Sequence, residues 1–148
     1  LIYIIYMDDA EIKYLEKAIN NENNESLVNL TFDKIEKTKR EMLDKLQLSK
    51  KETRELLKKL DNYRYVEEIN ELQYGNYLRW INLNDSDNLK LANGGILCEI
   101  KIDDNINLVL KNFMNRHFQI NMEENLLFQK FSDQEMVILY ALEHINED

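Results

Sequence analysis

The chain has 148 residues, of which 44% are hydrophobic and 32% carry a formal charge. This composition is too apolar for intrinsic disorder, and the length allows one buried core. The formal net charge of −9 excludes an attraction of the whole chain to nucleic acid or to an anionic membrane, although a local basic patch can still act.

The first six residues are apolar, but they are far too short to span a membrane. They also lack the basic flank and cleavage site of a signal peptide, so we expect an edge strand or a tail there. Met7 follows at once, so either the protein starts at Met7 or the sequence begins inside a longer chain. Cys98 is the only cysteine, which excludes an internal disulfide and favours a reducing compartment. We therefore expect an intracellular protein that is neither secreted nor attached to a membrane.

Residues 8–60 show the 3.6-residue periodicity of helices. Asp8 or Asp9 can cap a first helix, and a second is expected to begin near Asp33. Residues 49–52 have the spacing of a capping box, which predicts a third helix and a break at residues 47–49. The apolar stripes of the first two helices are Ile12, Leu15, Ala18 and Ile19, then Phe32, Ile35, Met42, Leu43 and Leu46.

Residues 65–72 indicate one more short helix, which Gly75 would end in a left-handed conformation. The periodicity then changes to two, and residues 77–83, 89–92 and 96–102 are expected to be strands. The sequence Asn93-Gly94 between the last two is a strong hairpin signal. On this interpretation the core-facing residues are Ile96, Cys98, Ile100 and Ile102, and then Ile106, Leu108 and Leu110 after a turn at residues 103–105.

A further hairpin is expected from the alternation of Phe118 and Ile120 and of Leu126 and Phe128. Residues 132–135 form a second capping box, which opens a helix that is apolar on most sides and should be buried against the sheet or a partner. The predicted fold is α+β: a helical part at residues 1–72, then a small antiparallel meander or partly closed barrel of five or six strands and a C-terminal helix at residues 73–148.

Residues 34–59 form the one basic region of an acidic chain. Two helices joined by a short turn resemble a helix-turn-helix, in which the second helix would present Lys50, Lys51, Arg54 and Lys58 to a major groove. The alternative is an ordinary solvated surface on which lysines and glutamates alternate.

Residues 91–94, with Asp103, Asn107, Leu108 and Leu110, resemble the first motif of Sm-like RNA-binding ring proteins. The spacing here is shorter, Glu99 occupies a region where that family has a strand glycine, and the second motif with its Arg-Gly pair is missing. The resemblance implies a small RNA-binding barrel, whereas hairpin chemistry alone also explains the pattern.

A metal or hydrolytic site would have to draw on Asp103, Asp104, His117, Glu123, Glu124 and His144. These residues have no ligand spacing and no convergent acid, base and nucleophile, so we expect no catalysis and no cofactor. His117 should face outward, and Cys98 should be a buried, inert thiol.

Trp80 lies near several tyrosines and beside Arg79, and these residue types dominate protein interfaces. Tyr77, Arg79 and Trp80 are therefore the candidate partner-binding residues. The alternative is that Trp80 is half-buried in a seam between the helices and the sheet.

Three segments of the second half resemble a small uncharacterised protein family of large DNA viruses of eukaryotes. They are Tyr74-Gly75-Asn76-Tyr77-Leu78-Arg79-Trp80-Ile81, Asn93-Gly94-Gly95-Ile96-Leu97-Cys98-Glu99-Ile100-Lys101-Ile102 and Leu127-Phe128-Gln129-Lys130-Phe131-Ser132-Asp133-Gln134-Glu135. The resemblance implies a viral protein in the host cytoplasm, nucleus or virion, and it brings no established activity. We therefore expect a non-catalytic interaction or assembly module that binds another protein or itself. Nucleic-acid binding through the basic helices or an Sm-like barrel is the alternative.

Overall fold

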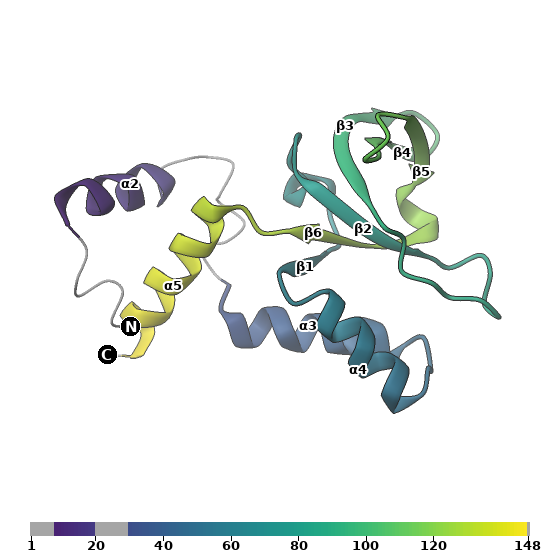
Figure 1. Cartoon of the computed structure of the whole chain (residues 1–148), viewed down its shortest axis with the longest axis horizontal. Coiled ribbons are helices and arrows are strands. Elements are labelled where there is room, and N and C mark those ends of the chain that lie inside the picture. The colour runs from purple at the N-terminus through teal and green to yellow at the C-terminus, as the bar shows by residue number, and fades with distance from the viewer. Residues whose placement is uncertain (1–7, 20–29, 148) are drawn as a thin grey trace. The chain divides into compact units, whose positions relative to one another are not determined.

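Residues 8–19 and 30–147 are described by a computed structural model, except for the side chains of Leu15, Ala18, Ile19 and residues 145–147 (Figure 1). The expected edge strand or tail at residues 1–6 and the candidate start at Met7 lie outside the described residues. The chain forms two compact units, Leu1–Lys37 with Phe131–Asp148 and Thr38–Lys130. We call them the helical unit and the sheet unit.

The helical unit contains α2 (Asp9–Ile19), the first turns of α3 (Phe32–Asp44), and α5 (Asp133–Glu147). The Oδ1 atom of Asp8 accepts a hydrogen bond from the N–H of Glu11 at 2.8 Å, which confirms Asp8 as a cap. The core contains Ile35, Phe131, Ile138 and Leu139, with Leu30, Phe32, Met136 and Leu142 packed against it. The buried side of α5 therefore belongs to a helical core, where the sequence had suggested packing against the sheet or a partner.

Both predicted helix starts are confirmed, the one at Ser132 as a complete capping box and the one at Ser49 as a side-chain cap. The N–H of Glu52 donates to Oγ of Ser49 at 3.1 Å and begins α4 (Lys50–Lys59). At α5, Ser132 and Glu135 exchange backbone-to-side-chain hydrogen bonds of 2.9 and 3.1 Å. Gln47 adopts a positive φ of 55°, so the predicted break between α3 and α4 is confirmed.

The sheet unit is built on six antiparallel strands in the order β1-β6-β2-β3-β4-β5, which confirms the α+β class. They are β1 (Tyr63–Val66), β2 (Tyr77–Asn82), β3 (Gly95–Ile102), β4 (Ile106–Lys111), β5 (His117–Asn121) and β6 (Asn125–Lys130). β2 to β5 form a meander, and β6 returns to lie between β1 and β2. The expected hairpin of residues 118–128 is therefore wrong, because β5 pairs with β4 whereas β6 pairs with β1 and β2.

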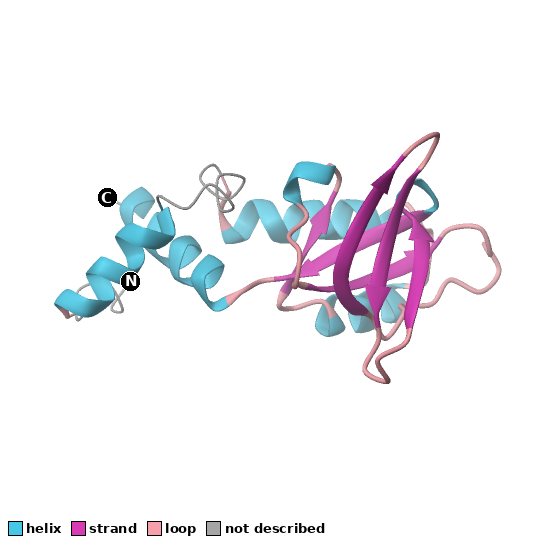
Figure 2. Cartoon of the chain, turned by 90° about the horizontal axis from the view of Figure 1, so that it is seen from above, coloured by secondary structure: helices cyan, strands magenta, loops and turns pink. Residues whose placement is uncertain are grey.

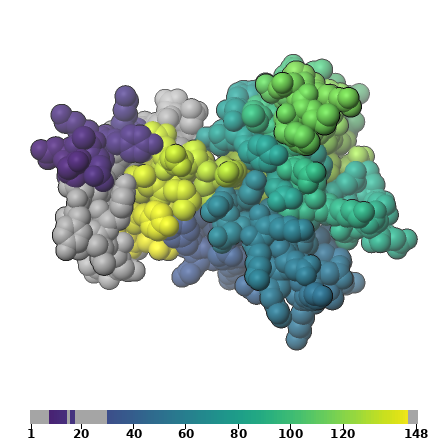
Figure 3. All heavy atoms as spheres, in the orientation of Figure 1, coloured from purple at the N-terminus to yellow at the C-terminus, as the bar shows by residue number. Residues whose placement is uncertain are grey.

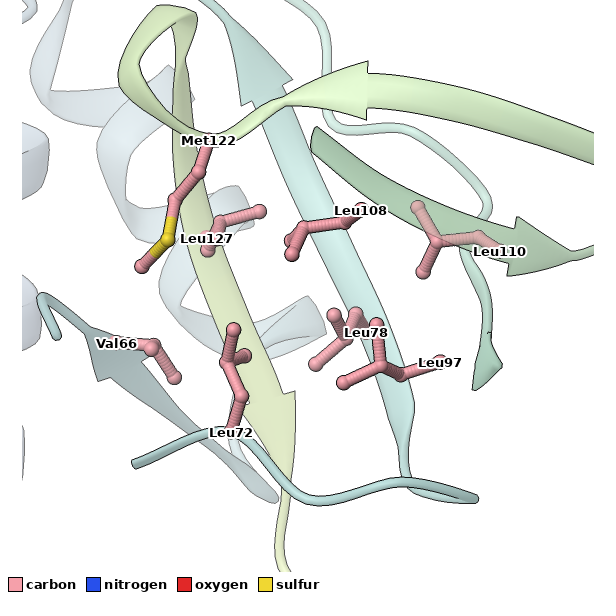
Figure 4. Packing of buried hydrophobic residues seen from close by; sticks show 8 residues of the cluster. All are labelled: Val66, Leu72, Leu78, Leu97, Leu108, Leu110, Met122 and Leu127. Atoms are coloured by element: carbon pink, nitrogen blue, oxygen red, sulfur yellow. The ribbon is translucent and has the colours of Figure 1, made fainter. Parts of the chain in front are cut away.

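The layer formed by β1, β6 and β2 has a core on each face, because successive side chains of a strand point to opposite sides. On one face, Val66, Leu72, Leu78, Leu97, Leu108, Leu110, Met122 and Leu127 converge (Figure 4). On the other face, Leu43, Leu60, Ile81, Leu126 and Phe128 pack together, with further leucines of α4 against them. Figure 2 shows the strands of this unit in magenta. β6 is the middle strand of this three-strand layer, and its residues 125–129 are all buried.

The predicted phase of β3 is wrong for Ile96, Cys98 and Ile102 and correct for Ile100, which packs against the core. Leu97 is buried, whereas Ile96 and Cys98 are exposed and Ile102 is 66% exposed. The pairing of β3 with β4 shifts between Leu97 and Glu99, which is a β-bulge. One extra residue moves every following side chain to the other face, so strict alternation from Ile96 fails.

Two further segments differ from expectation. Residues 63–66 form strand β1 and residues 69–71 a 3-10 turn (η2, Ile69–Glu71), where the sequence predicted a helix at residues 65–72. Residues 89–92 make only the isolated bridge of Leu91 to Ile81. Asn93-Gly94 therefore ends a long connection between β2 and β3 instead of forming a two-residue hairpin. Pairing with distant residues decided the first case, since residues 63–66 form a strand beside β6. In the second case, only Leu91 finds a partner residue.

Candidate functional site

The three predicted partner-binding residues lie on two different faces of β2. Trp80 is half-buried, as the alternative interpretation expected, and its ring packs at 5.4 Å from the ring of Phe118. Trp80 thereby packs against the core whose eight buried residues Figure 4 labels, and not in a seam with the helices. Tyr77 and Arg79 have the opposite strand phase, so the structure does not bring the three side chains together.

The polar atoms of Tyr77 and Arg79 hold the connection between β2 and β3. The hydroxyl of Tyr77 donates to the carbonyl oxygen of Asn93 at 2.9 Å, and Nε of Arg79 donates to that of Ala92 at 2.8 Å. Gly94 sits directly against these two side chains with a φ of +105°. These hydrogen bonds hold the β2–β3 connection in place, so they do not support the prediction that Tyr77 and Arg79 bind a partner.

The four predicted nucleic-acid-binding residues, Lys50, Lys51, Arg54 and Lys58, are all exposed on α4. Lys50, Arg54 and Lys58 are spaced by four residues and so lie along one side of the helix. Glu52 and Glu55 are exposed between them, which dilutes the positive charge. In α3 the basic surface is smaller than the sequence suggested, because Lys39 is fully buried and donates to the carbonyl oxygen of Leu60 at 2.8 Å.

The acidic and histidine residues considered for catalysis are dispersed. Among residues 8–19 and 30–147, no three His, Cys, Asp or Glu side chains are grouped closely enough to hold a metal ion. Asp103 accepts from the N–H of Asn105 and is a turn residue, and His117 is exposed on β5, as expected. Cys98 is an exposed thiol at the bulge of β3, so the prediction that it is buried is wrong.

A more distinctive feature is the hairpin end between β4 and β5, residues 112–116, which we call the tip. Phe113 is 80% exposed and Met114 is 57% exposed. Oδ1 of Asn112 accepts from the N–H groups of Met114 and Arg116 at 2.9 and 3.1 Å, while Asn115 adopts a positive φ of 61°. One asparagine side chain thus fixes the backbone that presents two large apolar side chains to solvent.

The tip is also the basic end of the sheet. Residues 106–121 contain no acidic residue, although the whole chain has a net charge of −9. Lys111 and His117 face each other across the strands next to the tip, and Arg116 lies within it. In Figure 3 the bright green atoms of this segment lie at the surface of the sheet unit.

At the other end of the same strands lies a cavity of about 540 Å³, which we call the acidic groove. Its apolar lining consists of Ile69, Leu83, Ile106, Met122 and Leu126, together with the ring of Tyr65. Glu67, Glu68 and Glu123 line it as well, with Asn70 and Asn125. The groove is therefore apolar in its floor and negative at its border.

The walls of the acidic groove are fixed by side-chain hydrogen bonds. Oε2 of Glu71 accepts from the N–H groups of Glu67 and Glu68 at 2.8 and 2.9 Å. The carbonyl oxygen of Glu71 in turn accepts from Nε2 of the buried Gln129 at 2.9 Å. On the opposite wall, Oδ1 of Asn121 accepts from the N–H of Glu123 at 2.9 Å. The hollow is thus pre-formed by the fold.

Asn125 makes the groove chemically unusual. Its side chain is only 9% exposed, and its Nδ2 donates to the carbonyl oxygen of Asn121 at 2.8 Å. Its Oδ1 is buried with no hydrogen-bond donor in the described residues, and a buried acceptor without a partner is unfavourable. Nearby, burial and then the negative charges of Glu67 and Glu71 raise the pKa of the Tyr65 phenol. The carboxylates of Glu67, Glu68 and Glu123, which line the groove, favour a ligand that brings positive charge.

Sequence reasoning missed both the tip and the acidic groove. The tip had a usable signal, namely an acid-free run of residues 106–121 with Phe113-Met114 at its turn. The groove had none, because its lining comes from four separate segments, at residues 65–70, 83, 106 and 122–126.

Comparison of the chain with protein-family models, with curated proteins and with solved structures found no match. In the part of the chain that the structure describes, no helix combines the length and apolarity that crossing a membrane requires. The geometry of the sheet unit is therefore the basis for a functional proposal.

Proposed function

We propose that this protein is a non-catalytic interaction module that binds another protein through the tip of its β4–β5 hairpin. The observation that carries the proposal is the 80% exposure of Phe113 on a backbone fixed by Asn112. Exposure of a large apolar side chain to water is unfavourable, and such a side chain in a rigid turn is typical of a binding anchor. An intracellular or virion location and a viral origin stay predictions from the sequence.

Rigidity supports this assignment. An anchor that is already ordered loses little conformational entropy on binding, so more of its apolar contact contributes to affinity. Burying a phenylalanine side chain contributes about 1.5–3 kcal/mol. Ile96, which pairs with Lys111 beside the tip, and Tyr74, which precedes β2, are two further exposed apolar side chains.

The test replaces Phe113→Ser and Met114→Ser together, a change that we call the tip variant. Binding partners, including the chain itself, are measured by affinity capture and by sedimentation of the purified protein. We expect the tip variant to lose binding by about tenfold or more, since it removes most of the anchor. Because both side chains are exposed, the free energy of unfolding should change by less than about 0.5 kcal/mol.

The matched control is Ile12→Ser, which removes an exposed apolar side chain of α2 in the helical unit. It should leave binding unchanged. Equal binding by the wild type and the tip variant would refute the proposal. Loss of binding to lipid vesicles, with no effect on protein partners, would assign the tip to a membrane surface instead.

Nucleic-acid binding is the second candidate, favoured by the shared exposed side of Lys50, Arg54 and Lys58 on α4. If it is correct, affinity for duplex DNA or RNA falls steeply with salt, and Lys51→Glu with Arg54→Glu abolishes it. Lys90→Glu with Lys101→Glu is the control, because both lysines are exposed in the sheet unit outside α4. Absence of binding at low salt would eliminate this candidate.

A further inference from the structure

We propose that the partner of the tip is a second copy of this chain, and that the tip of one copy enters the acidic groove of the next. This inference rests on the proposed function, because it requires the tip to be a binding element. It adds the identity of the partner and the direction of assembly.

Charge complementarity is the first argument. Lys111 and His117 flank the tip, Arg116 lies within it, and residues 106–121 contain no acidic residue. In contrast, Glu67, Glu68 and Glu123 line the groove. Two copies in this arrangement place unlike charges together, and two tips or two grooves facing each other would place like charges together. The charge distribution therefore favours contact between unlike ends of the molecule.

Shape and hydrogen bonding are the second argument. A cavity of about 540 Å³ falls in the usual range for ligand sites, and its apolar floor at Ile69, Ile106 and Leu126 suits the side chains of Phe113 and Met114. Arginine carries five N–H donors. The guanidinium of Arg116 can therefore bring N–H donors and positive charge to the carboxylates of Glu67, Glu68 and Glu123, which line the groove.

The third argument is the placement of the two features. The tip follows Lys111 at the end of β4, whereas Ile106 at the start of β4 lines the groove. Six strand residues separate these ends by roughly 17 Å, so a tip cannot fold back into its own groove. Contact between copies joins two different surfaces, so assembly gives a pair with two reciprocal contacts, a larger ring or an open chain of copies.

The deciding experiment mixes two complementary variants. The tip variant, Phe113→Ser with Met114→Ser, keeps an intact groove. A groove variant, Glu67→Lys with Glu123→Lys, keeps an intact tip and repels another tip by charge. We expect the wild type to assemble as its concentration rises and each variant to stay a monomer. An equimolar mixture should form a dimer of twice the 17.8 kDa chain mass and nothing larger.

Asp44→Lys with Asp61→Lys is the control for the groove variant, because it changes the net charge equally at two exposed residues that do not line the groove. This control should assemble like the wild type. Circular dichroism of every variant checks that the sheet is retained.

Three results would overturn the inference. One is a wild type that stays monomeric up to about 1 mM, the upper limit of a measurable weak association. Another is a mixture of the two variants that forms no dimer, and the third is a tip variant that assembles like the wild type. If a different protein is captured by the wild type and lost by the tip variant in the first case, the proposed function stands and only the self-assembly fails.

A charge exchange gives an independent readout. Arg116→Glu should weaken assembly by about tenfold or more, and a copy with Glu67→Lys and Glu123→Lys should restore binding to it. Restoration requires that the substituted residues face each other. Weakening without restoration would show that the tip and groove are not in contact.

Discussion

At each end of the sheet unit, one polar side chain accepts hydrogen bonds from two backbone N–H groups, but the two surfaces differ in shape and charge. At the tip, Asn112 bonds two backbone N–H groups and fixes a convex, basic turn. At the groove, Glu71 bonds two backbone N–H groups and fixes the wall of a concave, acidic hollow. The comparison teaches that one polar side chain can set the shape of a connection, and that the surrounding residues then decide its charge and chemistry.

The largest effect is expected near the tip end, where the β2–β3 connection closes on β2. A Cβ atom at Gly94 would collide with the carbonyl oxygen of Leu78 and the ring of Tyr77, and its φ of +105° is unfavourable for alanine. We expect Gly94→Ala to lower the free energy of unfolding by about 3 kcal/mol or more. Denaturant unfolding measures this.

Gly75→Ala is the matched control for that substitution. Its φ is +85°, but a Cβ atom there has no neighbour within 4 Å, so only backbone strain of about 1 kcal/mol is expected. Equal destabilisation by the two substitutions would show that the β2–β3 connection does not pack tightly on β2.

The next effect tests the wall of the acidic groove. Glu71→Ala removes the acceptor of two N–H groups, and we expect the free energy of unfolding to fall by about 1–2 kcal/mol. Glu71→Gln keeps one acceptor oxygen and should lose less. Amide hydrogen exchange at Glu67 and Glu68 should accelerate in the alanine variant, and unchanged exchange would mean that Glu71 does not hold this wall.

At the tip the corresponding substitution is Asn112→Ala, with a smaller expected loss of about 1 kcal/mol because the turn is exposed. Asn112→Asp keeps the acceptor and serves as the control. Binding through the tip should weaken in Asn112→Ala even though Phe113 is intact, because a disordered anchor binds at an entropic cost. Unchanged binding would mean that the tip does not depend on its pre-formed shape.

The smallest effect concerns Tyr65 in the groove. Burial, followed by the charges of Glu67 and Glu71, raises the pKa of its phenol above 10.0. The neutral form is favoured in the fold, so its contribution to stability is complete below pH 10 and is lost as pH rises through the elevated pKa. The difference in tyrosinate absorbance between the wild type and Tyr65→Phe should show this titration. A midpoint at or below 10 would contradict it.

Elements with local signals were predictable from the sequence. Ser49 with Glu52 and Ser132 with Glu135 set helix starts by contacts three residues apart, and the turn at residues 103–105 is fixed by Asp103. The inward residues Leu108 and Leu110 were also predicted correctly, because β4 alternates without interruption. In these cases the pattern that predicts the structure lies within a few residues along the chain.

The sequence alone determined the α+β class, the helix starts at Ser49 and Ser132, and the inward residues Leu108 and Leu110 of β4. Only the tertiary structure decided that β6 lies between β1 and β2, that a bulge reverses the phase of β3, and that four separate segments line the acidic groove. The physical reason is that capping and alternation depend on neighbours in the chain. Strand pairing, bulges and cavities depend on contacts between residues far apart in sequence, whose partners no local pattern specifies.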